Sequence, residues 1–145
     1  MTRRLAPRTL GLLEDLELAY TVVDGPQGMA SSMPRTAAVT SPKLAVLRLH
    51  GRRTETWETT NAVVTERYRY LYDREQLAAT AELVDELLEW RGRDVHVVFN
   101  NNHSNYGTTN ALELAAIVAD RPAATDRRPA SGTTATSARR SPYVK

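Results

Sequence analysis

Three short runs of mostly apolar, often β-branched residues constrain the fold of this chain most, and each ends in polar side chains. They are "LAYTVVD" (residues 18–24), "KLAVLRLHG" (43–51) and "DVHVVFN" (94–100). Runs that are this short and this continuously apolar are typical of strands covered on both faces. Because segments with helical periodicity alternate with them, the strands should pair in parallel. The sequence therefore predicts an α/β fold with about three parallel strands.

Periodicity and capping residues predict three helices. Thr9 is expected to cap a short first helix, and the last helix is expected to start near Asn110, as its cap, and to run to about Ala119. Asp73 and Gln76 form a capping box at the start of the strongest helix. The buried stripe expected for that helix consists of Leu77, Ala81, Val84, Leu87 and Leu88.

Polar side chains gather where the three predicted strands end. Asp24 closes the first run, Arg48 and His50 lie near the end of the second, and asparagines occupy 100–102 after the third. The carboxyl ends of parallel strands meet at one edge of a sheet, and ligands of α/β proteins bind there. Strand alternation places Arg48, His50 and Asn100 on the same face, so we expect them to converge.

Two long connections, residues 25–42 and 52–72, leave from that same edge. Connections of this length are usually functional. Trp57 in the second connection either closes over a ligand or anchors the loop. Three tyrosines alternate further along it and either stack on a sugar or base or, as we favour, pack over the rim of the sheet. They are Tyr68, Tyr70 and Tyr72.

Charged residues at this edge suggest a site for a small polar or anionic ligand. Arg48 and Arg52 would hold the anion, because a guanidinium offers two parallel donors to a phosphate or carboxylate. The alternative for these arginines is an ion pair with a carboxylate from a part of the fold that this chain lacks. Asp24 or His50 would serve as the catalytic acid–base group.

The asparagine run supports the same site. Asn100 and Asn101 would orient the ligand through paired donors and acceptors. The alternative is turn formation, since asparagine tolerates left-handed backbone conformations, and we favour that interpretation for Asn102. His103 adds an imidazole nearby, but Asp24, His50 and His103 do not have the sequence spacing that is diagnostic of a metal site. We therefore predict no metal site and no cofactor.

The net charge of +2 is unevenly distributed along the chain. Residues 121–145 carry six of the 19 Lys and Arg and one of the 17 Asp and Glu, which leaves 13 basic against 16 acidic residues in 1–120. The last segment is rich in Ala, Ser, Thr and Pro, and we expect a disordered basic tail there after one domain over 1–120. The charge distribution argues against nucleic acid as the main partner, although the tail offers weak contacts.

The absence of cysteine excludes a disulfide framework and thiolate metal sites, and it fits a cytoplasmic protein. No stretch has the roughly 20 apolar residues that a membrane-spanning helix needs.

Four motifs in order resemble the YecE-like family, also called domain of unknown function 72. They are "AYTVVDGPQG" (19–28), "VLRLHGR" (46–52), "RYRYLYDREQLA" (67–78) and "FNNNHSNYGTTNALELA" (99–115). The resemblance covers roughly residues 8–120 and implies part of a TIM-type barrel, namely its carboxyl-terminal half. Gly25 stands where the family commonly has Glu, and His103 where an aromatic residue is frequent.

The resemblance supplies no reaction, because none is established for the family, so whether the chain is an enzyme stays open. A half-barrel would expose sheet edges. We therefore expect that the missing amino-terminal half or self-association completes the fold, and that the chain is a truncated gene product or starts at a codon assigned too late. The rivals to a ligand site are a remnant without activity and a non-catalytic interaction protein.

Overall fold

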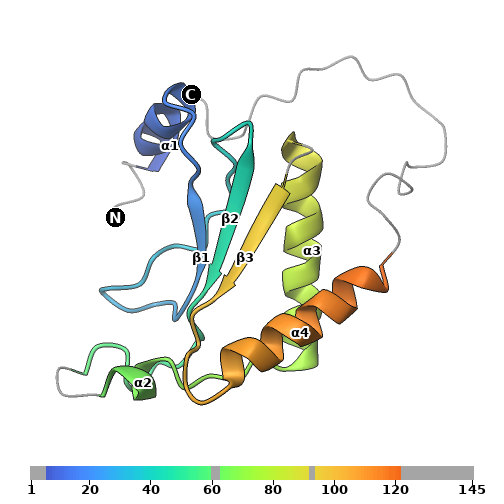
Figure 1. The fold of residues 1–145 in the computed structure, drawn as a ribbon. Coiled ribbons are helices and arrows are strands. Elements are labelled where there is room, and N and C mark those ends of the chain that lie inside the picture. The colour runs from blue at the N-terminus through green and yellow to red at the C-terminus, as the bar shows by residue number, and fades with distance from the viewer. Residues whose placement is uncertain (1–5, 60–62, 92–93, 122–145) are drawn as a thin grey trace.

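The computed structural model describes residues 6–59, 63–91 and 94–121 as three parallel strands with helices (Figure 1). The elements are α1 (Ala6–Asp15), β1 (Thr21–Asp24), β2 (Leu44–Leu49), α2 (Val64–Arg67), α3 (Arg74–Arg91), β3 (Asp94–Phe99) and α4 (Tyr106–Ala119). The strand order is β1-β2-β3, and both pairings are parallel. The predicted α/β class with three parallel strands is confirmed.

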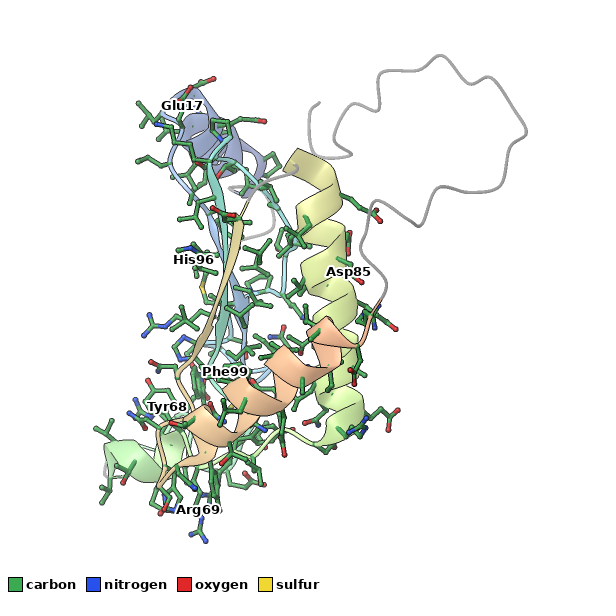
Figure 2. All side chains as sticks on the ribbon, turned by 45° about the vertical axis from the view of Figure 1, so that its right-hand side comes forward. Glu17, Tyr68, Arg69, Asp85, His96 and Phe99 are labelled. Atoms are coloured by element: carbon green, nitrogen blue, oxygen red, sulfur yellow. The ribbon has the colours of Figure 1, made fainter. Side chains whose placement is uncertain are left out.

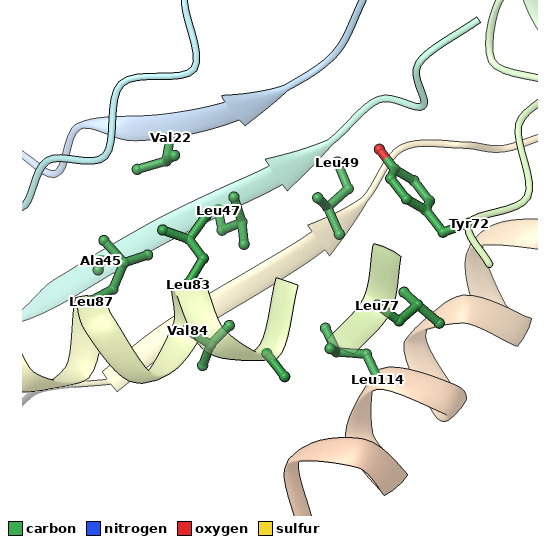
Figure 3. Close-up of a cluster of buried hydrophobic side chains, with 11 residues drawn as sticks. Val22, Ala45, Leu47, Leu49, Tyr72, Leu77, Leu83, Val84, Leu87 and Leu114 are labelled. Carbon is green, nitrogen blue, oxygen red and sulfur yellow. The ribbon is translucent and has the colours of Figure 1, made fainter. Parts of the chain in front are cut away.

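Helices α3 and α4 cover one face of the sheet and form the core with it (Figures 1 and 3). Leu47 on the central strand is fully buried, and it lies in register with Val22 on β1 and Val97 on β3. The stripe predicted for the strongest helix faces this sheet. Its side chains and those packed with them are Val22, Ala45, Leu47, Leu49, Tyr72, Leu77, Ala81, Leu83, Val84, Leu87 and Leu114.

The capping box is present, whereas two predicted helix starts are wrong. The Gln76 backbone N–H donates to Asp73 Oδ1 at 2.8 Å, and the Asp73 N–H donates to Gln76 Oε1 at 3.2 Å, so α3 starts as predicted. Helix α1 begins before Thr9, which lies inside it. Helix α4 begins before Asn110, which is fully buried within the helix and therefore caps nothing.

The second face of the sheet stays open in the part of the chain that the structure describes. Arg48, His96 and Val98 project from it and are exposed, and Val98 retains 44% of its accessible surface. Figure 2 shows His96 on the side of the sheet away from α3 and α4. The apolar runs predicted that both faces of the sheet would be buried. Within the described ranges, only the face toward α3 and α4 is buried.

The carboxyl ends of the strands lie together at the lower end of the sheet in Figure 1, next to α2 and the start of α4. Both long connections leave from this end. The predicted tail, apart from its first residue, lies outside the described residues. That first residue, Arg121, is bound to Asp85 of α3 at 2.9 Å.

Candidate functional site

Arg48, Asn100 and His50 form one hydrogen-bonded cluster at the carboxyl ends of β2 and β3. Arg48 Nη2 donates to Asn100 Oδ1 at 3.0 Å, and Asn100 Nδ2 lies 3.2 Å from His50 Nδ1. The backbone prepares this arrangement, because the Asn100 N–H donates to the Leu49 carbonyl at 2.7 Å and so extends the parallel ladder past the strands. The three side chains converge as expected from strand alternation, and we call them the Arg48–Asn100–His50 cluster.

The geometry assigns the proton positions of His50. An amide nitrogen can only donate, so Nδ1 of His50 accepts from Asn100 and the ring proton sits on Nε2. Burial lowers the pKa of His50 below its ordinary value, and the positive charge of Arg48 lowers it further, against a smaller opposing effect of Asp24. His50 is therefore a neutral imidazole near pH 7 that can offer one N–H.

Two aromatic rings from the long second connection lie beside His50. The Trp57 ring meets the imidazole edge-on, with centroids 6.2 Å apart, and the Tyr68 ring lies 5.7 Å from it at an angle of 38°. Trp57 and Tyr68 also contact each other edge-on at 6.1 Å. All three rings are half-buried. We call them the three-ring cluster.

Asp24 and Arg52 form a separate ion pair on the helix-facing side of the sheet edge. Asp24 is in register with Leu49 rather than with Arg48, so its side chain points to the opposite face from the Arg48–Asn100–His50 cluster. Asp24 is 3% exposed, and its two carboxylate oxygens lie 3.0 and 3.3 Å from Arg52 Nε. Arg35 Nε lies 3.6 Å from the same carboxylate.

The Tyr72 hydroxyl completes the environment of Asp24. It donates to Asp24 Oδ2 at 2.8 Å and accepts the Gly51 backbone N–H at 2.8 Å. Burial raises the pKa of Tyr72 above its ordinary value, and the negative charge of Asp24 raises it further, so the phenol keeps its proton. Burial alone would lower the pKa of Arg52, but the hydrogen bond and charge of Asp24 more than offset this.

Asn101 does not join either group at the surface, although the sequence suggested a ligand contact. Its side chain is fully buried, and Nδ2 donates to the Tyr70 carbonyl and to Asn110 Oδ1, each at 2.9 Å. Its Oδ1 is buried without a hydrogen-bond partner among the described residues. The side chain thus holds the connection before α3 against α4.

Asn110 is a site-supporting residue that sequence reasoning missed. Its Oδ1 accepts the Tyr72 backbone N–H at 3.0 Å, and its Nδ2 donates to the Tyr72 carbonyl at 2.9 Å, so one side chain pairs with the backbone as a strand would. A signal was present in the sequence. Asn110 lies one helical turn before Leu114, on the buried stripe of α4, where an amide needs partners.

The loose metal set of Asp24, His50 and His103 is not assembled. His103 Nδ1 lies 3.7 Å from Glu66 Oε1 and packs against the Tyr106 ring at 5.2 Å. Within residues 6–59, 63–91 and 94–121, no group of three or more His, Asp or Glu side chains could hold a metal ion.

None of the helices in these described ranges is long and apolar enough to cross a membrane.

Comparisons with known proteins identify the family. The chain matches the family model "Protein of unknown function DUF72" over residues 2–134. It resembles the crystal structure of a DUF72 family protein from Enterococcus faecalis, with a TM-score of 0.74 and 25% identity over 83% of this chain and 44% of that one. For a DUF72 family protein from Thermotoga maritima the TM-score is 0.69, with 31% identity over 78% of this chain and 41% of that one.

The chain therefore spans less than half the length of these solved relatives. A search of curated proteins found no match. Since the family model covers most of the sequence, the chain belongs to the DUF72 family.

Proposed function

We propose that the protein binds a small anionic ligand at the carboxyl ends of its strands, through Arg48. One observation carries this proposal. Arg48 is exposed and its side chain donates to a neutral amide, and no carboxylate of the described residues lies within ion-pair distance of it. Arg52 and Arg53, by contrast, are paired with Asp24 and Glu66. A guanidinium held in place by a neutral partner keeps its charge and most of its donors for an external anion.

The residues of the cluster take different roles in this proposal. Arg48 holds the anion with the donors that Asn100 does not use. His50 offers its Nε2 proton and is the acid–base candidate if the ligand reacts. Asn100 orients both neighbours and contributes to the ligand site through them.

Three of the residues that the sequence suggested anchor segments next to the site and do not contact the ligand in this proposal. The Asp24 carboxylate neutralises Arg52, so we assign this pair to anchoring the start of the second connection instead of contacting the ligand. Asn101 has the same kind of role, because its amide is enclosed. The proposed activity is binding, and no reaction class is assigned.

The test is a calorimetric titration of the protein with inorganic phosphate as the probe anion. We expect measurable binding that Arg48→Ala weakens at least about tenfold, because a charge-assisted hydrogen bond is worth roughly 1.5–3 kcal/mol. Arg48→Lys should retain part of the affinity, since it keeps the charge but loses the planar donors.

Arg69→Ala is the matched control. It also removes an exposed guanidinium at this end of the sheet, but that guanidinium lies 3.5 Å from Glu66 and outside the cluster. Phosphate binding that is equally strong in the wild type and Arg48→Ala, or equally weakened by Arg69→Ala, would overturn the proposal.

A further inference from the structure

The three-ring cluster has features that burial of apolar surface alone does not explain. His50 directly follows β2, Trp57 and Tyr68 come from the second connection, and the three rings meet with centroids 5.7–6.2 Å apart. Each of these residues nevertheless stays partly exposed, whereas Tyr72, which packs in the core, is 1% exposed. Aromatic rings that are fixed in place yet accessible provide a surface against which another ring can pack at little entropic cost.

His50 belongs to both clusters and connects them. Its Nδ1 accepts from Asn100, which in turn accepts from Arg48, while its ring contacts Trp57 and Tyr68. An anion held by Arg48 would therefore lie near aromatic surface, because Asn100 bridges Arg48 and His50. A bare inorganic anion would leave that surface unused.

We infer that the ligand is a phosphate monoester whose organic part carries a ring, with the phosphate at Arg48 and the ring packed on the three-ring cluster. The inference rests on the proposed anion site and specifies its ligand class. A phosphate suits the site because its several oxygens can accept from two donors of the guanidinium together. The ring is either a sugar, which packs an apolar face on an aromatic ring, or a nucleobase, which stacks.

Four probes separate these possibilities in calorimetric titrations. They are inorganic phosphate, glycerol phosphate, a hexose phosphate and adenosine monophosphate. We expect at least one ring-bearing ester to bind about tenfold more tightly than glycerol phosphate, which lies within the range that a stacked ring contributes. Preference for the hexose ester or for the adenosine ester identifies the ring.

Variants localise the effect. Tyr68→Leu should reduce the affinity for the ring-bearing ester to that for glycerol phosphate and leave inorganic phosphate binding unchanged. Trp57→Leu provides a second test should Tyr68→Leu fail to fold. Tyr106→Leu is the matched control, since Tyr106 also packs beside a histidine, His103, but belongs to α4 and not to the cluster.

The outcomes distinguish this inference from the proposed function. If phosphate binds through Arg48 and the ring-bearing esters bind no better than glycerol phosphate, the inference is overturned and the anion site stands. If the ring advantage persists in both Tyr68→Leu and Trp57→Leu, the inference is likewise overturned. If no probe binds in a manner that depends on Arg48, the proposed function itself fails.

Discussion

Arg48 Nη2 donates to Asn100 Oδ1 at 3.0 Å across the carboxyl ends of two neighbouring strands, β2 and β3. This bond fixes the orientation of the Asn100 amide, because the oxygen must face the guanidinium and the nitrogen must then face His50. The imidazole is thereby required to accept at Nδ1. A protonated His50 would present N–H donors at both nitrogens and conflict with this arrangement.

The first prediction is that acidification destabilises the protein through His50. Its pKa is lowered from 6.5 in the folded state, so the unfolded chain takes up the proton first as the pH falls. The stability contribution is complete above pH 6.5 and is lost as the pH falls through the lowered pKa. Unfolding free energies measured against pH should fall less steeply in His50→Gln than in the wild type.

His96→Gln is the control for this profile, since His96 is an exposed histidine on the same open sheet face. It should leave the slope of the wild type unchanged. Identical slopes for the wild type and His50→Gln would show that His50 does not contribute.

The second prediction separates ligand orientation from turn formation at the asparagines. Asn100→Ala should weaken phosphate binding by about fivefold, because one hydrogen bond worth about 1 kcal/mol no longer orients Arg48. Arg48→Ala should weaken it more, since a charge is lost. Asn102→Gly should have little effect, because Gly adopts the same backbone conformations. If Asn100 only formed the turn, the Asn100→Ala variant would bind phosphate as tightly as the wild type. Phosphate titrations and thermal melts of each variant distinguish the two roles.

The third prediction concerns Gly51, which has φ = +85° directly after the cluster. A Cβ built there would lie 2.5 Å from Tyr70 Cβ, so the added methyl meets both a strained backbone and a clash. Gly51→Ala should lower the free energy of unfolding by about 2–4 kcal/mol. Gly11→Ala, in α1 with nothing within 4 Å of its Cβ, should instead stabilise by roughly 0.5–1 kcal/mol. Chemical denaturation measures both, and equal effects would contradict this account.

The fourth prediction concerns Asn110. Asn110→Ala leaves the buried Tyr72 N–H and carbonyl without their partner, at a cost of roughly 2–4 kcal/mol in unfolding free energy. Asn105→Ala is the control: Asn105 occupies the N-cap of α4 but makes no side-chain capping bond, so the change should stay within about 0.5 kcal/mol. One net hydrogen bond contributes about 1 kcal/mol. If Asn110→Ala lowers the free energy of unfolding by less than about this amount, water replaces the amide as the partner of Tyr72.

The fifth prediction follows from the open sheet face. Val98, near the carboxyl end of β3, is 44% exposed on this face, and parallel sheets are normally covered on both faces, so we expect residues 1–145 to self-associate. Sedimentation velocity should show oligomers that Val98→Lys shifts toward monomer. Leu112→Lys, at an exposed position of α4, tests whether α4 rather than the open sheet face mediates the association. A wild-type chain that stays monomeric and melts cooperatively would contradict the expectation.

Much of the secondary structure was predictable because its determinants are local. The three strands follow from short apolar runs with β-branched residues, and the start of α3 follows from Asp73 and Gln76, which bond to each other within a single turn. Strand alternation was also sufficient to place Arg48 and Asn100 on one face, since side-chain direction has a period of two along any strand. The family motifs agree with this local pattern.

What tertiary structure decided is which polar side chains are buried together and which face a ligand. Asp24 meets Tyr72 across 48 residues of sequence, and Asn110 meets the backbone of the same tyrosine across 38. Such pairings depend on how far each strand extends and on which helix packs against it. A local sequence pattern encodes neither of these. Asp24 and Asn101 read as site residues in the sequence because it shows their polarity, while only packing determines whether a polar group is satisfied inside the protein or left for solvent.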